Sequence, residues 1–469
     1  MVRATAFDER GKIVAAAARA LISINPQPGW VELDQESVLT ALGQAVQELK
    51  PKLSETPELL CLTAPTDGIW LVDPAGAPVR PAILPTDHRA VAYAREWASL
   101  GILNAVYRRA GYALVPPSQA ALLRWLLENE LASLERTASA FAYKDALLHQ
   151  LTGARVTDIA DASAPFLDIR SRTYDEELID LLRLRPIRQL LPELDLPTGS
   201  LWPLSDHGAE LTGLPAGLAV HAGPFDSIAT GLAAGLQGTG DACIILGPRL
   251  VTGVQIERLE LNGEPSGRTV CLPRYDRWVR LLTSASGMTL LDWLLPLVGV
   301  TYTGLDAALQ RTPPGSHGVT LVPAFSELGE TAPHLDSGAR GRIAGLTTNT
   351  SKDDLARAAC EGLAMHARYC IGTAELTPGV VTLTGGGSRA PAFRQLLADI
   401  LGVPLHVSPQ PETAARGAVI AGMLAAELPY DHFTWTAPTA EILPNPEVAP
   451  LYDALFASYA AEQLASRRS

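Results

Sequence analysis

The chain has 469 residues, 47% of them hydrophobic and 19% charged, and its formal net charge is −13. This length exceeds what one hydrophobic core organises and favours two large domains, and the composition is that of a globular rather than a disordered protein. The acidic balance argues against nucleic acid as a partner, because negative charge repels phosphate backbones.

A cytoplasmic location is expected. No run of about 18 uncharged apolar residues occurs, which argues against a membrane span. Residues 8–10 are charged where a signal peptide would need apolar residues. The nine histidines never fall at metal-ligand spacing, so no metal site built from protein side chains is expected. An odd number of cysteines without a Cys-x-x-Cys pair is typical of reduced thiols; they are Cys61, Cys243, Cys271, Cys360 and Cys370.

An N-terminal β-hairpin is the first predicted element. Residues 2–7 alternate weakly between large and small side chains, residues 8–11 have turn chemistry, and residues 12–17 form the predicted returning strand. Farther along, short apolar runs alternate with helical patterns, which is typical of α/β layering. We expect strands within residues 59–76, helices over 89–103 and 117–153, and short helices and loops over 175–215.

A second unit is expected to begin at residue 223, which divides the chain into predicted domains 1–222 and 223–469. Residues 241–272 predict a strand, a Gly-Pro turn and two further strands, and this opening resembles the hairpin at the N-terminus. The rest alternates between the two kinds of element. We expect helices over 286–298, 352–374 and 447–465, and strands at the start of 380–388 and within 404–409.

Asp226 lies in the stretch HAGPFDSIATGLAAG, where a loop turns into a helix. One interpretation is a helix N-cap, because an Asp side chain accepts hydrogen bonds from the free backbone amides there. The other is a general base, because α/β sheets present carboxylates at strand-to-helix junctions. The residues alone leave both interpretations open.

Three successive glycines follow a predicted buried strand in VVTLTGGGSRAPAFRQLLADILG, residues 380–402. Glycines let the backbone approach a ligand closely, and the following helix start carries the positive end of a dipole. This pattern favours a nucleotide over a plain turn. It is not GxGxxG and has no Walker lysine, so it supports neither a dinucleotide fold nor a P-loop.

Together these motifs resemble the FGGY carbohydrate kinases, a family within the actin, hexokinase and Hsp70 superfamily. Residues 341–361 fit the second family signature, with Cys360 as a deviation. The triple-glycine stretch and residues 412–418 resemble the adenosine-binding block. Further family landmarks are matched by residues 28–34, 87–89, 151–153, 157–158 and 329–333.

The resemblance implies an α/β fold of two ribonuclease-H-like (actin-like ATPase) domains that flank a central cleft. It implies ATP and Mg²⁺, a small sugar or polyol as substrate, and Asp226 as the base that takes a proton from the attacked hydroxyl. No nucleic-acid or membrane partner is expected, and a homodimer stays open. The residues implied for ATP are Gly247, Arg249, Gly385, Gly386, Gly387 and Ser388, and those for the substrate are Asp67, Asp87, Arg89 and Asp226.

Several positions depart from the family pattern. Relatives have a strand ending in Asp-x-Gly-Thr-Thr-Ser before the opening hairpin, and without it we expect an unpaired sheet edge in the first half. Gly247-Pro248-Arg249 stands where relatives have hydroxyl residues, and proline lacks both a hydroxyl and an amide donor. Other departures are Leu122 for a lysine, Pro85 for a tryptophan, and Thr66-Asp67-Gly68 where xylulose kinases tend to show Met-His-Gly.

Two functional readings follow from these departures. The first is an active sugar or polyol kinase whose recorded start is too late or whose gene is shortened. The second is a catalytically impaired, kinase-like protein that binds a sugar or nucleotide as a sensor or regulatory subunit. Pro248 favours the second reading independently of the start.

Overall fold

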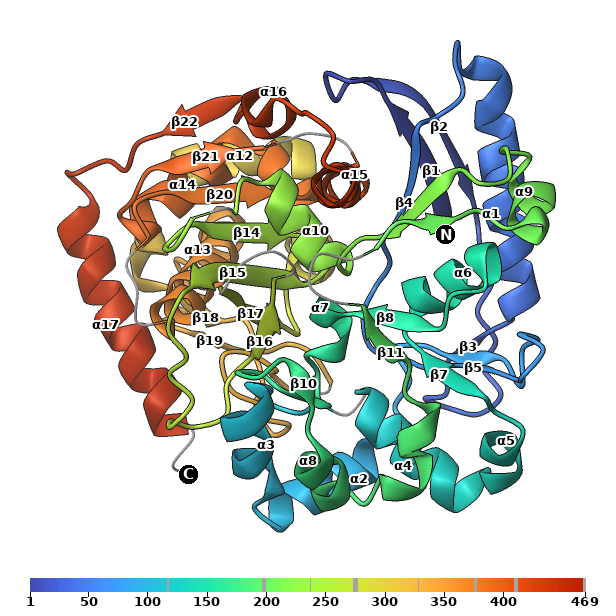
Figure 1. Cartoon of the computed structure of the whole chain (residues 1–469). Coiled ribbons are helices and arrows are strands. Elements are labelled where there is room, and N and C mark those ends of the chain that lie inside the picture. The colour runs from blue at the N-terminus through green and yellow to red at the C-terminus, as the bar shows by residue number, and fades with distance from the viewer. Residues whose placement is uncertain are drawn as a thin grey trace.

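The structure is a computed structural model (Figure 1). It describes residues 1–115, 118–195, 200–236, 238–272, 277–327, 329–374, 378–408 and 412–466.

A seven-stranded mixed sheet organises the second half of the chain. Its order is β16-β17-β15-β14-β20-β21-β22. The bounds are β14 (Ala242–Leu246), β15 (Leu250–Ile256), β16 (Arg268–Cys271), β17 (Trp278–Ser284), β20 (Val381–Thr384), β21 (Leu405–Val407) and β22 (Ala440–Ile442). β14, β20 and β21 run parallel to one another, so the carboxyl ends of β14 and β20 lie side by side.

Helices cover both faces of this sheet. The helices are α10 (Asp226–Ala233), α11 (Met288–Val298), α12 (Tyr302–Arg311), α13 (Lys352–Gly372), α14 (Pro391–Leu401), α15 (Thr413–Ala425), α16 (His432–Thr436) and α17 (Ala449–Ser466). Ile244 packs in the core formed with α11, α13 and α14, whereas its neighbour Cys243 packs on the opposite face with Ile228 of α10. The uninterrupted apolar run of β14 therefore reflects burial on both faces.

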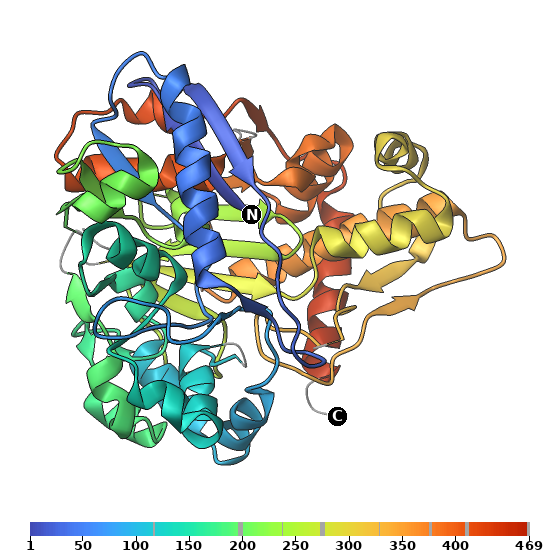
Figure 2. The same cartoon turned by 90° about the vertical axis from the view of Figure 1, so that its right-hand side faces the viewer.

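The first half contains shorter sheets and smaller helices, and α1 (blue) crosses its outer face in Figure 2. The helices are α1 (Gln35–Leu49), α2 (Val91–Ser99), α3 (Ile102–Ala110), α4 (Gln119–Asn129), α5 (Leu131–Glu135), α6 (Tyr143–Thr152), α7 (Ile159–Ala162), α8 (Glu176–Leu181) and α9 (Asp206–Thr212). The strands are β1 (Val2–Phe7), β2 (Ile13–Arg19), β3 (Glu32–Leu33), β4 (Leu59–Leu62), β5 (Trp70–Val72), β6 (Ala82–Ile83), β7 (Ser139–Phe141), β8 (Val156–Asp158), β9 (Leu167–Asp168), β10 (Thr173–Tyr174), β11 (Glu193–Asp195), β12 (Trp202–Pro203) and β13 (Ala219–Ala222). The hairpin of β18 (Thr320–Val322) and β19 (Arg342–Ala344) belongs to the second half.

The sheets of the first half are small: among the described residues, five have two strands and one has three. β1 pairs only with β2, which confirms the predicted N-terminal hairpin. β4 pairs only with β13, in parallel, at the end of a three-stranded sheet. Open edges are thus general in this half, and an edge left by a missing strand stays a prediction.

The structure corrects two sequence predictions. The predicted helix over residues 117–153 is interrupted by β7, which pairs antiparallel with β5. Three buried residues are too few for a strand to show its own periodicity. The predicted helix over residues 89–103 ends at Ser99, and a new helix starts after Gly101, whose φ of 70° breaks the α-helical backbone. The boundary between residues 222 and 223 stays a prediction.

Among the described residues no single helix is long and apolar enough to cross a membrane. Only α11 and α12 taken together reach that length and composition, and the two are bent by 80° relative to each other.

His221 makes the stability of the fold depend on pH. It lies buried in β13, and burial lowers its pKa to about 4. In the unfolded chain a histidine titrates near pH ~6.5. Between these values the unfolded chain binds a proton that the folded chain does not, so stability falls as the pH falls through this window.

We therefore expect the native chain to lose about 2 kcal/mol more unfolding free energy than His221→Gln between pH 7.5 and pH 5. Urea unfolding at both pH values measures this difference. The exposed His207 provides the control, and His207→Gln should behave as the native chain does. Equal losses in the native chain and His221→Gln would contradict the assignment.

Candidate functional site

Asp226 is the first residue of α10, and the structure rules out its reading as an N-cap. Phe225 occupies the cap position, and no side chain caps this helix. The Asp226 carboxylate instead accepts a hydrogen bond from the Ser227 hydroxyl at 3.1 Å. The Asp226 amide donates to the carbonyl of Ala64, in the loop after β4, at 3.0 Å. The helix start is thus held by the first half of the chain.

The surroundings of Asp226 suit a proton acceptor. Burial raises the pKa of this carboxyl group, and the nearby negative charge of Asp161 raises it further. The positive charge of Arg268 acts in the opposite direction. A carboxylate with a raised pKa is a better base than an ordinary surface Asp.

Asp67 forms an ion pair with Arg268 from the other half of the chain. Arg268 Nη2 donates to both carboxylate oxygens, at 2.9 and 2.7 Å, and also to the Tyr112 hydroxyl at 3.0 Å. Arg268 Nη1 donates to the Thr66 hydroxyl at 3.2 Å. Asp67 and Gly68 both have positive φ, at 64° and 74°, so the loop after β4 turns sharply at this pair.

Asp87 and Arg89 lie in a second, more deeply buried cluster. Arg89 donates to Asp87 through Nε at 2.9 Å and Nη2 at 2.8 Å, and to Glu32 through Nη2 at 2.7 Å. Asp87 also accepts from the backbone amides of Val31 and Arg89, at 2.6 and 2.8 Å. The Asp87 carboxylate therefore positions Arg89, and its direct contact with a substrate stays a prediction.

The Arg89 guanidinium is also packed against two indole rings. Its carbon lies 4.0 Å from the ring centroid of Trp30 and 5.0 Å from that of Trp125. Cation–π attraction and two carboxylates thus compensate the buried charge. Arg89 Nη1 is the exception, because it is buried without a hydrogen-bond partner among the described residues.

The predicted nucleotide residues come together at the carboxyl ends of β14 and β20. Gly385 has a φ of 93°, and a Cβ added there would lie 2.7 Å from the Leu246 carbonyl oxygen. A Cβ on Gly387 would lie 2.5 Å from the Leu246 side chain. Ser388 is buried and its hydroxyl donates to the Gly385 carbonyl at 2.7 Å. The glycine run therefore lies against the end of β14, just before Gly247.

The hairpin turn at Gly247 is anchored to the start of α11. The Met288 amide donates to the Gly247 carbonyl at 2.9 Å, and the Thr289 hydroxyl donates to the Pro248 carbonyl at 3.0 Å. Pro248 and Arg249 are exposed. The Arg249 side chain makes no hydrogen bond or ion pair with any described residue, so its predicted contact with phosphate is untested.

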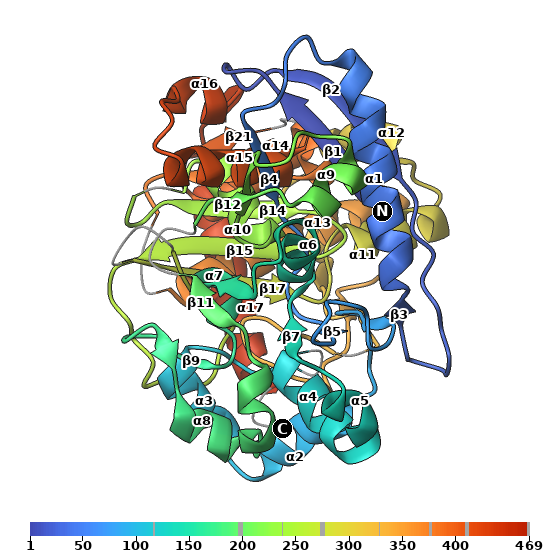
Figure 3. The same cartoon turned by 45° about the vertical axis from the view of Figure 1, so that its right-hand side comes forward.

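Helix α10 packs on α15, as Figures 1 and 3 show, and this contact links the helix that carries the base to the helix that lies beside the glycine run. A Cβ on Gly417 of α15 would lie only 1.7 Å from the Ala229 carbonyl oxygen of α10. At the start of α15, the hydroxyls of Thr413 and Thr384 lie 3.4 Å apart, and Thr384 directly precedes Gly385. Asp226 is therefore linked to the predicted nucleotide residues through two contacts, that of α10 with α15 and that of Thr413 with Thr384.

Three aspartates that lie close enough together to share a metal ion already have a cation. They are Asp145, Asp158 and Asp161. The Lys144 ammonium lies 2.6, 2.5 and 2.9 Å from their carboxylate oxygens, in that order. Burial raises the pKa of Asp145 to about 7, although the Lys144 charge opposes the shift. We interpret this cluster as an internal charge network rather than a metal site.

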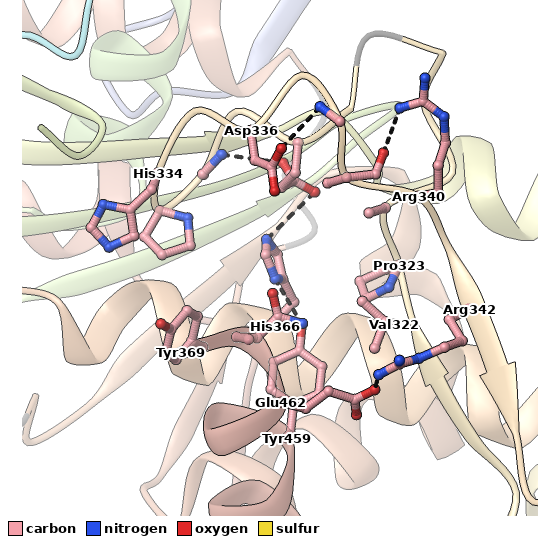
Figure 4. Close-up of a pocket in the computed structure, with 17 residues that line it drawn as sticks. Val322, Pro323, His334, Asp336, Arg340, Arg342, His366, Tyr369, Tyr459 and Glu462 are labelled. Atoms are coloured by element: carbon pink, nitrogen blue, oxygen red, sulfur yellow. Dashed lines mark hydrogen bonds and ion pairs between the residues drawn. The ribbon is translucent and has the colours of Figure 1, made fainter. Parts of the chain in front are cut away.

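A cavity of about 400 Å³ lies in the second half, between the loop over residues 330–342, α13 and α17 (Figure 4). None of the predicted site residues lines it. His366 bonds to the Tyr459 hydroxyl at 2.9 Å, and its other nitrogen lies 3.7 Å from Glu330. Glu330 in turn accepts hydrogen bonds from Ser284 and the Ala285 amide. These contacts attach α17 to the end of β17.

Sequence reasoning missed Arg268, Tyr112 and Glu32. Arg268 and Glu32 were expected only as parts of strands or of a family landmark, and Tyr112 carried no signal. The available signal for Arg268 was an arginine at the start of a predicted buried strand, which requires a counter-charge. No local pattern identifies Asp67 as that counter-charge.

Close packing at Gly417 generates a testable prediction. We expect Gly417→Ala to lower the free energy of unfolding by about 1–3 kcal/mol or more, because the new methyl group would collide with α10. Thermal unfolding measures the loss. Gly372→Ala, at the end of α13 with no heavy atom within 4 Å, is the control and should leave the melting temperature unchanged or raise it. Equal melting temperatures for both variants would contradict the close contact.

Comparison with known proteins identifies the family. The N-terminal domain of the FGGY family of carbohydrate kinases matches residues 1–233, and the C-terminal domain matches residues 277–426. An erythritol kinase from Brucella abortus (strain 2308) is 29% identical, over 99% of this chain and 94% of the relative. A glycerol kinase from Acidovorax ebreus (strain TPSY) is 30% identical, over 90% of this chain and 88% of the relative.

A solved structure shows the same fold. The xylulose kinase from Rhodospirillum rubrum superposes with a TM-score of 0.89 at 26% identity, covering 97% of this chain and 94% of the other. The α/β architecture with two actin-like ATPase domains is therefore confirmed. The chain belongs to the FGGY family of carbohydrate kinases.

Proposed function

We propose that this protein transfers the γ-phosphoryl group of ATP to a hydroxyl of a small sugar or polyol, with Asp226 as the general base. The arrangement of α10 is the observation that supports this most. Its first residue is a carboxylate with a raised pKa, next to the polar cluster of Asp67 and Arg268. The rest of α10 packs on α15, and the start of α15 lies next to the glycine run in space.

Asp226 accepts the proton that the substrate hydroxyl loses as it attacks phosphorus. Phosphoryl transfer requires little covalent chemistry from a protein, so positioning and charge neutralisation supply most of the catalysis. Only the ionised carboxylate accepts the proton, so activity rises with pH through the raised pKa of Asp226.

The nucleotide binds at Gly247 and Gly385–Ser388 in this proposal. Gly385 and Gly387 pack against Leu246, whereas a Cβ added at Gly386 would meet no heavy atom within 4 Å, so the backbone at Gly386 is open to a ligand. Arg249 is exposed at the same hairpin and is available to a phosphate. Mg²⁺ would arrive with ATP and neutralise phosphate charge.

The substrate binds near Asp67 and Arg89. The two N–H groups of Arg89 Nη1, which have no partner among the described residues, are the donors that we assign to a substrate hydroxyl. Relatives named as erythritol, glycerol and xylulose kinases support a sugar or polyol of three to five carbons. Those relatives are named as kinases. This supports the hypothesis of an active kinase over that of a catalytically impaired, kinase-like binding protein. Cytoplasmic location and a homodimer stay predictions.

Replacing the base is the direct test. We expect Asp226→Asn to lower kcat by about 10²-fold or more, because an amide does not accept the proton. Coupled ADP release with glycerol, erythritol and xylulose measures turnover. Asp206→Asn changes an exposed carboxylate in the first turn of α9 and is the matched control. Turnover by Asp226→Asn that equals the native rate would remove Asp226 from the role of base.

The nucleotide site has a separate test at Gly386. A Cβ added there meets no heavy atom within 4 Å, so Gly386→Ala should keep the native melting temperature. If ATP approaches this backbone closely, the same methyl group should weaken ATP binding by about tenfold or more. Calorimetric titration with ATP measures the affinity. Gly379→Ala, also without a neighbour within 4 Å, should bind ATP as the native chain does. Unchanged affinity in Gly386→Ala would contradict the predicted site.

A further inference from the structure

The Asp67–Arg268 pair lies beside the base. The Arg268 guanidinium carbon is 5.7 Å from the ring centroid of Phe225, the residue before Asp226. On the other side, the Asp226 amide bonds to Ala64, three residues before Asp67. Both ends of the pair are therefore fixed next to the start of α10.

The pair is nearly closed to solvent but is not sealed. The side chains of Arg268 and Asp67 are 9% and 14% exposed. The Arg268 guanidinium carbon lies 4.6 Å from the centroid of the Tyr112 ring, which covers one face of the guanidinium. The Tyr112 hydroxyl accepts a hydrogen bond from Arg268. The Asp67 carboxylate is therefore the more accessible member of the ion pair.

Three arginines of the predicted substrate side each have a carboxylate partner. Arg268 is paired with Asp67, Arg89 with Asp87 and Glu32, and Arg80 with Glu32. Asp226 adds a further carboxylate, which forms no ion pair with any described residue. None of these three arginines is therefore left without a counter-charge that an additional anion would supply.

This charge balance discriminates between substrate classes. A carboxylate on a substrate would be desolvated close to the like charges of Asp67 and Asp226, which is unfavourable. Arg268 beside them is already paired with Asp67 and offers little compensation. The hydroxyls of a neutral polyol can donate to Asp67 without separating it from Arg268. Neutral and acidic substrates of the same length therefore differ in binding free energy.

We propose that the Asp67–Arg268 pair makes this site selective for neutral polyhydroxy substrates and excludes sugar acids. This inference rests on the proposed function, because it assumes that the sugar or polyol binds beside Asp226. It assigns Arg268 a role in specificity through Asp67, with Tyr112 as the residue that positions it.

Calorimetric titration with matched ligands tests the proposal without requiring turnover. The pairs are glycerol and glycerate, erythritol and erythronate, and xylitol and xylonate. The native chain should bind at least one polyol tenfold or more tightly than the acid of the same length. Asp67→Asn leaves Arg268 without its counter-charge and should shift that ratio by tenfold or more towards the acid. Asp206→Asn should keep the native ratio.

A second variant guards against misfolding of the first. Tyr112→Phe keeps the ring and removes only the hydroxyl that holds Arg268, and it should shift the ratio in the same direction by a smaller factor. Circular dichroism and the melting temperature establish that each variant is folded. If Asp67→Asn does not fold, the shift in Tyr112→Phe alone decides, and an unchanged ratio there overturns the proposal.

Three results overturn the inference. They are equal or tighter binding of the acids by the native chain, an unchanged ratio in folded Asp67→Asn, and no binding of any of the six ligands. Failure of the proposed function has a different signature. A native chain that shows the predicted ratio but transfers no phosphate to any polyol rejects the phosphoryl transfer and leaves the binding selectivity in place.

Discussion

The close packing of α10 on α15 is the contact on which the rest of the site depends. It is possible only because Gly417 has no side chain where the Ala229 carbonyl approaches. α15 also packs against β4 of the first half, where a Cβ on Gly422 would lie 2.4 Å from the Cys61 sulfur. A single helix therefore fixes the base, the loop that carries Asp67 and the start of the glycine run relative to one another.

Compensation of buried charge is the second organising feature. The arginines of the site, Arg89 and Arg268, each have a carboxylate partner and an aromatic ring against the guanidinium. Lys144 compensates three buried aspartates in the same way. Such pairs contribute little net stability, because desolvation offsets their attraction, but they fix side-chain geometry and the local charge. At this site the local charge acts directly on a bound substrate.

The regular elements were largely predictable from the sequence. The N-terminal hairpin, the strand before the triple glycine and the long helix α13 follow from turn residues, apolar runs and helical periodicity. The errors occur where those signals are weak. β7 has only three residues, and the break at Gly101 depends on a single backbone angle. Local patterns carry too little information at this length to decide between a helix and a strand.

The sequence alone determined the family, the helix start at Asp226 and the glycine run after β20, because each is a local feature of consecutive residues. Only the tertiary structure decided which charges face each other. Arg268 and Asp67 are separated by 201 positions, and Arg89 and Glu32 by 57. An ion pair acts over a few ångströms in space and has no preferred separation along the chain. The partners, and with them the charge balance of the site, therefore become visible only once the chain is folded.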